Sequence, residues 1–505
     1  MLKKLLLALL VVLWALPAVA ELVDTAWVRY YNGPAGSGDF PSAVASDWWG
    51  NVYVTGYSPG EGTGDDYATI KYTPGGDIVW VRRYNGPGNG NDWAYALALD
   101  GENNVYVTGR SEGIGLDGDC ATIKYCPNGD TAWVRRYNGP VNGNDWPWSV
   151  AVDHSGYVYL TGGSEITANT FACLTIKYRP DGDTAWIRTY RQAGFGWNWA
   201  YVVASDEAGN VHVTGRCGTG SISGSDYLTI KYYPDGETAW VRTYNGPADD
   251  ADYSFDLAID HVGDVYVTGE SCGDSTPENL TIKYDRDGNE LWISRIEKCQ
   301  HIFGEHKVTL DESGNAYVCG MGQAGGEIGW CQYLLVKYCP DGQIDWTRRY
   351  GGIHTNAFPY GLGLDIHGDV YVTGYGGPNL TTLKHDSEGS LWWTQEYFTP
   401  NLSGWWSGRQ LATDYMGNVY VTAPVAGDYS TIKYVQFWYS RGDVNEDEEI
   451  DVTDVIYLID YVLRAGPELT PFLPMGNVNC DAAADLADVV YLVNYVFRDG
   501  PKPCP

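Results

Sequence analysis

Positive charge, long hydrophobic runs and closely spaced cysteine pairs are all scarce in this 505-residue sequence. Its 32 Lys and Arg residues face 64 Asp and Glu residues, which gives a formal net charge of −32 at pH 7. A negative field of this size repels phosphate backbones, so nucleic acid is excluded as a natural partner. The charge fits calcium binding or a basic partner, and it also fits a plain solvated acidic surface.

After residue 20 no stretch is apolar for long enough to span a membrane as a helix. The first twenty residues are different, because Lys3 and Lys4 precede an apolar run that ends in Ala18-Val19-Ala20. This order is typical of a secretory signal peptide, residues 1–20, cleaved before Glu21. The sequence therefore predicts a secreted protein, either extracellular or attached to a cell surface.

The eleven cysteines suit an oxidising compartment, and none belongs to a C-x-x-C pair, which argues against a zinc site. Cys480 and Cys504 stand apart from the others and can pair with each other. An odd count leaves at least one thiol outside intramolecular disulfides. We interpret all eleven as structural or incidental rather than catalytic.

Three short motifs recur eight times in a fixed order: D-x-x-G-[ND]-V-Y-V-T-G, then T-I-K-Y, then W-[VI]-R-x-Y. Successive tryptophans of the third motif are 52 to 54 residues apart, except the last pair at 46. A period of this length, filled with short strands, indicates a radial array of sheets. The tryptophans are Trp27, Trp80, Trp133, Trp186, Trp240, Trp292, Trp346 and Trp392.

The second repeat shows four predicted strands. Residues 92–99 alternate small and large side chains, and "NVYVTG" and "ATIKY" are rich in β-branched and aromatic residues. A Pro-Asn-Gly turn then leads into "TAWVRRY". Four antiparallel strands per repeat, arranged in a ring, describe a mainly β protein, the β-propeller.

The order of the motifs predicts how the ring closes. The chain begins with a lone tryptophan strand at residues 27–31 and ends its repeats with three strands, at 410–414, 418–422 and 430–434. One strand and three strands complete a blade, and closure removes exposed sheet edges. We therefore predict eight four-stranded blades over residues 21–438, the last blade being shared by both ends.

The words "VYVTG" and "TIKY" and the "PDG-x-x-x-W" hairpin resemble the SBBP family of bacterial β-propeller repeats, which occur in exported proteins. The resemblance covers about residues 22–434. It implies the propeller fold and no catalytic residue, because blade structure defines the family.

Two copies of another motif follow the repeats. The chain reads "GDVNEDEEIDVTDV" from Gly442 and "GNVNCDAAADLADV" from Gly476, and an apolar helical pattern follows each copy. Calcium takes six to eight oxygen ligands, and this spacing wraps a twelve-residue loop around one ion. The predicted Ca²⁺ ligands are Asp443, Asn445, Asp447, Glu449 (through its carbonyl), Asp451 and Asp454 in the first loop, and Asn477, Asn479, Asp481, Ala483 (through its carbonyl), Asp485 and Asp488 in the second.

This pair of loops and helices resembles a dockerin domain, over residues 441–505. The resemblance implies a small α-helical calcium-binding module that docks to a cohesin-like or other surface protein. The first loop has four carboxylates against three in the second, so we expect it to bind calcium more tightly. The alternative is an acidic tail with two amphipathic helices and no ion.

Histidines and a carboxylate gather in the sixth and seventh repeats. His301, Glu305 and His306 precede one predicted inner strand near Cys299, and His354 precedes the next. Such a cluster can do general acid/base chemistry. The simpler interpretation is variable loops that contain a few histidines.

Aromatic residues stand near the start of most predicted inner strands, where rings can stack on sugars or hold a peptide. A ring that recurs in every blade is instead a packing wedge. Trp148, Trp197 and Trp406 depart most from the repeat and are the candidate ligand residues. The other rings are Phe40, Trp93, Trp146, Trp199, Tyr253, Phe358, Tyr360 and Trp405.

Together these features predict an exported, non-catalytic β-propeller that binds a protein or glycan and is tethered through a calcium-dependent dockerin-like module. The alternative is a polysaccharide-processing enzyme, a glycoside hydrolase or lyase, carried on a dockerin. Binding of a polysaccharide without its cleavage would favour the binding propeller, and cleavage would favour the enzyme.

Overall fold

The computed structural model describes residues 22–437, except 37, 116, 193–195, 219–223, 274–275, 300–305, 324–329, 352–355, 378 and 400–409, together with 452, 455, 456, 458, 459, 489–493 and 496. The chain divides into two compact units. One comprises Thr25–Tyr434, and the other gathers Met1–Asp24 and Val435–Pro505.

The larger unit is built from four classes of strand. The innermost strands are β2 (Phe40–Ser46), β6 (Asp92–Leu99), β10 (Asp145–Val152), β14 (Trp199–Ser205), β18 (Asp252–Ile259), β22 (Lys307–Leu310), β26 (Ala357–Leu364) and β30 (Gln410–Thr413). The second strands are β3 (Val52–Pro59), β7 (Val105–Glu112), β11 (Val158–Thr167), β15 (Val211–Gly218), β19 (Val265–Cys272), β23 (Ala316–Gln323), β27 (Val370–Gly376) and β31 (Val419–Val425).

The third strands are β4 (Asp65–Tyr72), β8 (Gly118–Tyr125), β12 (Thr170–Tyr178), β16 (Ser225–Tyr232), β20 (Pro277–Tyr284), β24 (Cys331–Tyr338), β28 (Asn379–His385) and β32 (Asp428–Phe437). The outermost strands are β5 (Ile78–Tyr84), β9 (Thr131–Tyr137), β13 (Thr184–Tyr190), β17 (Thr238–Tyr244), β21 (Glu290–Glu297), β25 (Ile344–Tyr350), β29 (Leu391–Phe398) and β1 (Leu22–Tyr31).

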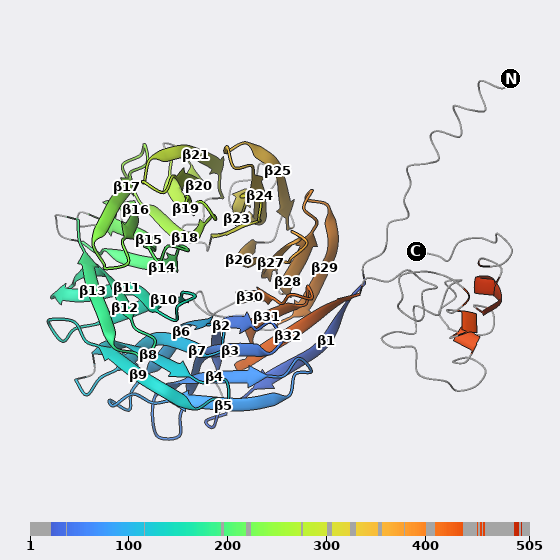
Figure 1. Cartoon of the computed structure of the whole chain (residues 1–505), viewed down its shortest axis with the longest axis horizontal. Coiled ribbons are helices and arrows are strands. Elements are labelled where there is room, and N and C mark those ends of the chain that lie inside the picture. The colour runs from blue at the N-terminus through green and yellow to red at the C-terminus, as the bar shows by residue number, and fades with distance from the viewer. Residues whose placement is uncertain are drawn as a thin grey trace. The chain divides into compact units, whose positions relative to one another are not determined.

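These strands form eight four-stranded sheets arranged in a ring (Figure 1). Blades 1 to 7 take consecutive strands, from β2–β5 to β26–β29. The eighth sheet has the order β1-β32-β31-β30. We call it the closing blade, because it joins the first strand of the chain to the last three. The predicted eight-bladed propeller with a shared last blade is confirmed.

The middle strands of each blade are buried on both faces because neighbouring blades cover them. Val105, Tyr106 and Val107 in β7 have no exposed surface, and neither has Thr108, whose hydroxyl lies 3.0 Å from that of Thr122. β-Branched and aromatic residues pack well on such pleated surfaces. This explains why "VYVTG" and "TIKY" recur, and it places the cores between blades.

A repeated hydrogen-bonded contact, which we call the latch, joins each blade to the next. The indole Nε1 of Trp133 in β9 donates to the carbonyl of Pro180, 3.2 Å away in the "PDG" turn between β12 and β13 of blade 3. Nε of Arg135 donates to the carbonyl of Gly182 in the same turn at 2.7 Å. Gly182 has a φ of +87°, and a Cβ there would lie 2.8 Å from the Trp133 ring. The W-x-R motif of one blade therefore requires the "PDG" turn of the next.

The latch recurs around the ring with one exception among the described residues. Tryptophan Nε1 groups donate to the next turn from Trp27, Trp80, Trp133, Trp186, Trp240, Trp292 and Trp346. Trp393 faces the closing blade, where β32 and β1 come from opposite ends of the chain and no turn joins them. Its buried Nε1 has no hydrogen-bond partner in the described part of the chain.

Blade 7 corrects one expected position. Trp392 was predicted as its wedge tryptophan, but Trp393 pairs with Lys384 as Trp346 pairs with Lys337 in blade 6. Trp393 is 7% exposed and Trp392 is 37% exposed. The wedge is therefore Trp393, and the spacing from Trp346 is one residue longer than expected.

In the C-terminal unit the described residues are helical where amphipathic helices are predicted. Val455 and Leu458 are buried and lie three residues apart, as do Val489 and Leu492. All twelve predicted calcium ligands lie outside the described residues, so the dockerin-like module stays a prediction. In the part of the chain that the structure describes, no helix is both long and apolar enough to cross a membrane.

Candidate functional site: an aromatic arc on the loop face

Connections between strands leave the ring on two opposite faces, because neighbouring strands within each sheet are antiparallel. We call one the loop face. It carries the connections from second to third strands and the long connections from each outer strand to the next inner strand. The other, the turn face, carries the D-x-x-G turns and the "PDG" turns. Functional residues concentrate on variable loops held by a rigid scaffold, which directs attention to the loop face.

Buried carboxylates anchor the long connections on the loop face. The backbone N–H groups of Gly86, Gly139 and Gly246 donate to Asp92, Asp145 and Asp252 over 2.6 to 2.7 Å. These three carboxylates have no exposed surface. Burial raises the pKa of both Asp145 and Asp252 to about 6, because it disfavours the charged form. In blade 4 the chain itself uses a neutral residue, Asn198, which accepts from Gln192.

The wild type is expected to lose folding stability as pH rises, because buried Asp145 must then ionise, and Asp145→Asn is expected to remove this loss. A carboxyl whose pKa is higher in the folded chain than in the unfolded chain stabilises the folded state at acid pH. That contribution is lost as pH rises from about 4, the unfolded pKa, through about 6, the folded pKa. The variant should therefore gain on the order of 2 kcal/mol over the wild type as pH rises through this window. Urea unfolding at several pH values measures it, and parallel pH curves for the two proteins would contradict it.

A β-bulge near the start of the inner strand re-aims one side chain in each of blades 1 to 5 and in blade 7. The register shifts between Ala94 and Ala96, and equivalent shifts occur in β2, β10, β14, β18 and β26. A bulge re-aims the side chain of the extra residue. The bulged residues are Ser42, Tyr95, Trp148, Tyr201, Phe255 and Tyr360.

Trp148 is therefore a member of the repeat, contrary to the expectation that it departs from it. Counting back from the D-x-x-G aspartate of each blade would have revealed this position, because the bulged residue always precedes that aspartate by five. His306 precedes Asp311 by five and takes the same place in blade 6. Its ring is stacked on Phe255, with centroids 5.7 Å apart.

Eight rings on blades 1 to 4 form a connected series that we call the aromatic arc. Tyr57 lies 6.0 Å from Trp93, Tyr95 lies 5.0 Å from Trp148, and Trp148 lies 6.0 Å from Trp146 and 6.1 Å from Trp199, between centroids. Phe171 is stacked on Trp199 at 4.9 Å and meets the edge of Trp197 at 6.4 Å. Trp197 is 45% exposed, and the other arc residues are half-buried. The arc is Tyr57, Trp93, Tyr95, Trp146, Trp148, Phe171, Trp197 and Trp199.

Arg110 joins the two tryptophans of blades 2 and 3 that do not touch directly. Its guanidinium lies 5.5 Å from the Trp93 ring centroid and 5.0 Å from that of Trp146, and it donates to Asn144 at 3.2 Å. Cation–π contacts of this kind fix both rings. Trp93 also donates from Nε1 to Asp65 at 2.7 Å. The arc is thus a preorganised surface with polar groups along it.

The structure places the predicted ligand and acid/base residues in different surroundings. Trp148 lies within the arc, and Trp197 is its most exposed ring. Trp406 lies outside the described residues, as do His301, Glu305 and His354 of the predicted acid/base cluster. His306 is fully buried and its Nε2 lies 2.7 Å from Oδ1 of Asn279, while Cys299 forms a disulfide with Cys331. What the structure describes of this cluster is packed rather than presented to a substrate.

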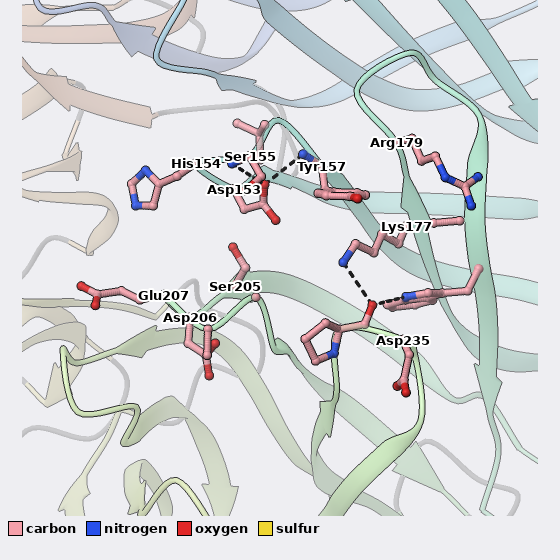
Figure 2. Close-up of a pocket in the computed structure, with 16 residues that line it drawn as sticks. Asp153, His154, Ser155, Tyr157, Lys177, Arg179, Ser205, Asp206, Glu207 and Asp235 are labelled. Atoms are coloured by element: carbon pink, nitrogen blue, oxygen red, sulfur yellow. Dashed lines mark hydrogen bonds between the residues drawn. The ribbon is translucent and has the colours of Figure 1, made fainter.

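A large cavity of about 740 Å³ lies instead on the turn face, between blades 3 and 4 (Figure 2). Asp153 and Asp206 face each other across it, and Lys177 and Arg179 line one side. Tyr157, Ser155, His154, Ser205, Glu207 and Asp235 complete the labelled lining.

The inner groups of this cavity are occupied by structural bonds. Asp153 accepts from the N–H groups of Ser155 and Tyr157 and from the hydroxyl of Tyr159. Lys177 donates to the carbonyl of Pro234, 3.1 Å away, beside the latch of Trp186 (Figure 2). His154, His261 and His367 are exposed on the turns of this face. The cavity is a polar gap between blades, and the carboxylates of Asp153 and Asp206 hold the turns that border it.

Comparison with known proteins agrees with this architecture. The SBBP family profile, described as a beta-propeller repeat, matches residues 79–115 and 345–379. Both segments are propeller repeats. The first runs from β5 into the connection after β7 of blade 2, and the second runs from β25 to the start of β28 in blade 7. No curated protein sequence matches this chain.

Several solved structures are similar to this chain at low sequence identity. The polysaccharide lyase Uly1 is 10% identical, with a TM-score of 0.44 over 82% of this chain and 98% of that chain. A PL25 ulvan lyase is 12% identical, with a TM-score of 0.41 over 66% and 90%. An inactive variant of virginiamycin B lyase from Staphylococcus aureus is 10% identical, with a TM-score of 0.40 over 81% and 99%. With TM-scores below 0.5, these similarities assign no activity to this chain.

Proposed function

We propose that this chain is an exported, non-catalytic propeller whose aromatic arc holds an extended glycan on the loop face. The observation that carries the proposal is a series of eight rings over four consecutive blades, bridged by Arg110 between Trp93 and Trp146 and ending in the half-exposed indole of Trp197. Aromatic rings offer flat apolar faces at little entropic cost, and sugars present complementary C–H faces. The carboxylate of Asp65 and the amide of Asn144 lie beside the rings and supply polar partners.

Binding is favoured over polysaccharide cleavage by the state of the described ionisable groups. Cleavage needs an acid and a base that face a reacting atom. In the turn-face cavity the carboxylates of Asp153 and Asp206 are held by their own turns, and His306 is buried on the loop face. A calcium-dependent dockerin-like module, residues 441–505, would attach the propeller to a cohesin-like surface protein, as the loop motifs predict.

The arc is tested by affinity electrophoresis of the full chain in gels that contain xylan, mixed-linkage β-glucan or polygalacturonate. We expect at least one polysaccharide to retard the wild type and Trp197→Ala to weaken that retention about tenfold, which corresponds to about 1.4 kcal/mol. Trp148→Ala should weaken it as well. Phe398→Ala, an exposed ring on β29 far from the arc, is the matched control and should behave like the wild type.

Product analysis of the same mixtures separates binding from catalysis. Retention without new reducing ends or unsaturated sugars supports a binding platform. Depolymerisation that Trp197→Ala slows would indicate a polysaccharide-processing enzyme instead of a binding platform. If both tryptophan variants are retained as strongly as the wild type, the arc serves packing alone.

A further inference from the structure

The turn face carries rigid tips whose side chains point to solvent. In each D-x-x-G turn the aspartate carboxylate caps the backbone, as Asp47 Oδ1 does for the N–H groups of Trp49 and Asn51 at 3.0 and 2.8 Å. Asp414 holds Met416 and Asn418 in the same way at 3.0 and 2.9 Å. The two residues after each aspartate therefore stand on a fixed turn and cannot fold back into the core.

Three consecutive turns, in blade 7, the closing blade and blade 1, bear large apolar residues at these tips. Their exposed fractions run from 41 to 72%. The turns of blades 2 to 6 each carry Glu or His at one of these positions: Glu102, His154, Glu207, His261 and Glu312. The blade 5 turn also exposes Val262, and the blade 7 turn has His367 beside Ile366, so the three apolar turns differ in being adjacent to one another. We call the apolar set the turn-face patch, and its members are Trp48, Trp49, Ile366, Tyr415 and Met416.

The members of the patch are neighbours in space. Trp48 and Tyr415 are stacked with ring centroids 4.4 Å apart and planes inclined by 10°. The hydroxyl of Tyr420 in the closing blade donates to the carbonyl of Gly50, beside Trp49, at 3.3 Å. On the other side Thr413 donates to the carbonyl of Leu364, two residues before Ile366, at 2.8 Å. The three turns that bear these side chains are thus neighbours across three blades.

A contiguous exposed patch of this kind marks an interaction site, whereas single exposed apolar residues do not. Trp, Tyr and Met are the residues enriched at the centres of protein interfaces, where charged residues are depleted. The neighbouring "PDG"-type turn of blade 1 follows the same trend. It has Gly75 where the turns of blades 3, 4 and 6 have Asp181, Asp235 and Asp341.

We propose that the turn-face patch is the contact through which two copies of this chain associate, turn face to turn face. The area is sufficient, because the exposed 41 to 72% of five large side chains amounts to on the order of 100 Å² or more each, and two patches together approach roughly the 1,200 Å² at which specific interfaces begin. A two-fold axis pairs the same surface with itself and closes the assembly at a dimer. Both loop faces, with their aromatic arcs, then point outward.

The charge of the chain predicts how this association responds to salt. Two copies that each carry a net charge of −32 repel each other at low ionic strength. Added salt screens that repulsion while it leaves apolar contacts intact. Dimerisation should therefore strengthen with salt, whereas binding of a basic partner would weaken.

Sedimentation velocity of the full chain over a range of concentrations, at low and at high ionic strength, tests the proposal. The wild type should approach twice the monomer mass at high salt, and Trp49→Ser combined with Met416→Ser should stay monomeric. Ile114→Ser, an exposed apolar residue on the loop face, is the control and should dimerise like the wild type. Because all three positions lie on exposed tips, circular dichroism should show an unchanged fold.

Other results overturn the proposal. A wild type that stays monomeric at every concentration and salt level excludes it, and so does a dimer that the double variant leaves intact. A monomer that co-sediments with phosphatidylcholine vesicles only while Trp49 is present would make the patch a lipid contact. A monomer whose retardation by polysaccharide is lost in the double variant would make it a second sugar site.

Discussion

Removal of residues 22–31 is expected to lower the melting temperature of the propeller more than any single substitution inside a blade. These residues form β1, the outer strand of the closing blade. Without them β32 becomes an unpaired edge, and Trp27 no longer wedges against Tyr72 and Tyr420. Loss of a core tryptophan alone costs about 3–5 kcal/mol, a large part of the roughly 5–15 kcal/mol that holds a typical domain together.

Differential scanning calorimetry of the shortened and full chains measures this effect. Trp27→Ala should lower the melting temperature by a smaller amount, because it keeps the strand but loses the latch to Pro74. Ala26→Ser, at an exposed position of the same strand, is the matched control and should change little. An unchanged melting temperature after removal of the strand would show that the ring holds closed without β1.

Asp454→Ala is expected to remove the tighter of two bound calcium ions. Asp454 is the last predicted ligand of the first loop, which brings four carboxylates together, and these repel one another without a cation. We expect the affinity of this loop to fall about a hundredfold, or about 2.7 kcal/mol. Isothermal titration of the full chain with calcium should then show only the weaker site, which Asp485→Ala should remove instead.

The same loop offers an internal control. Glu446 stands at loop position 4, which supplies no ligand, so Glu446→Gln lowers the charge by the same amount and should keep both sites. Helical signal that follows calcium in the wild type and is lost in Asp454→Ala would support the dockerin-like module. A chain that takes up no calcium would refute it and leave an acidic helical tail.

The repeat predicted the fold because its motifs are themselves consequences of the fold. A strand such as β7, apolar on both faces, can be buried only between two other sheets, and eight copies leave a ring as the solution. The lone strand at the start and the three at the end then had to share a blade. Little beyond strand pattern and motif order was needed.

Details that depend on register could not be predicted in this way. A period-two pattern over residues 92–99 gives no sign of the bulge at Tyr95, because one extra residue reverses every later side chain. Trp392 and Trp393 are chemically identical, and only the pairing of Trp393 with Lys384 shows which one is the wedge. The latch was missed because its acceptors are backbone carbonyls, which every residue has.

The aromatic arc was foreseen in part. Trp148 and Trp197 were chosen as exceptions to the repeat, yet Trp148 is near the centre of the arc because it obeys the repeat. Tyr95, which contacts Trp148, and Arg110, which contacts Trp93 and Trp146, were not chosen, since a linear sequence does not show which side chains of adjacent blades meet. The turn-face patch was also missed, although Trp48-Trp49 breaks an otherwise polar turn motif.

Because the closing blade uses strands from both ends of the propeller, it can form only after nearly all of the propeller has been synthesised. β1 is the first strand to leave the ribosome, and its partner β32 follows about 400 residues later, which at about 5–20 residues per second means roughly 20–80 seconds. Until then the ring is an open arc of blades. Because β1 pairs on one side only, at the rim, it can join a nearly finished ring from outside. If the shared strand were an innermost one, a chain end would have to insert at the middle of the ring, between blades that are already packed.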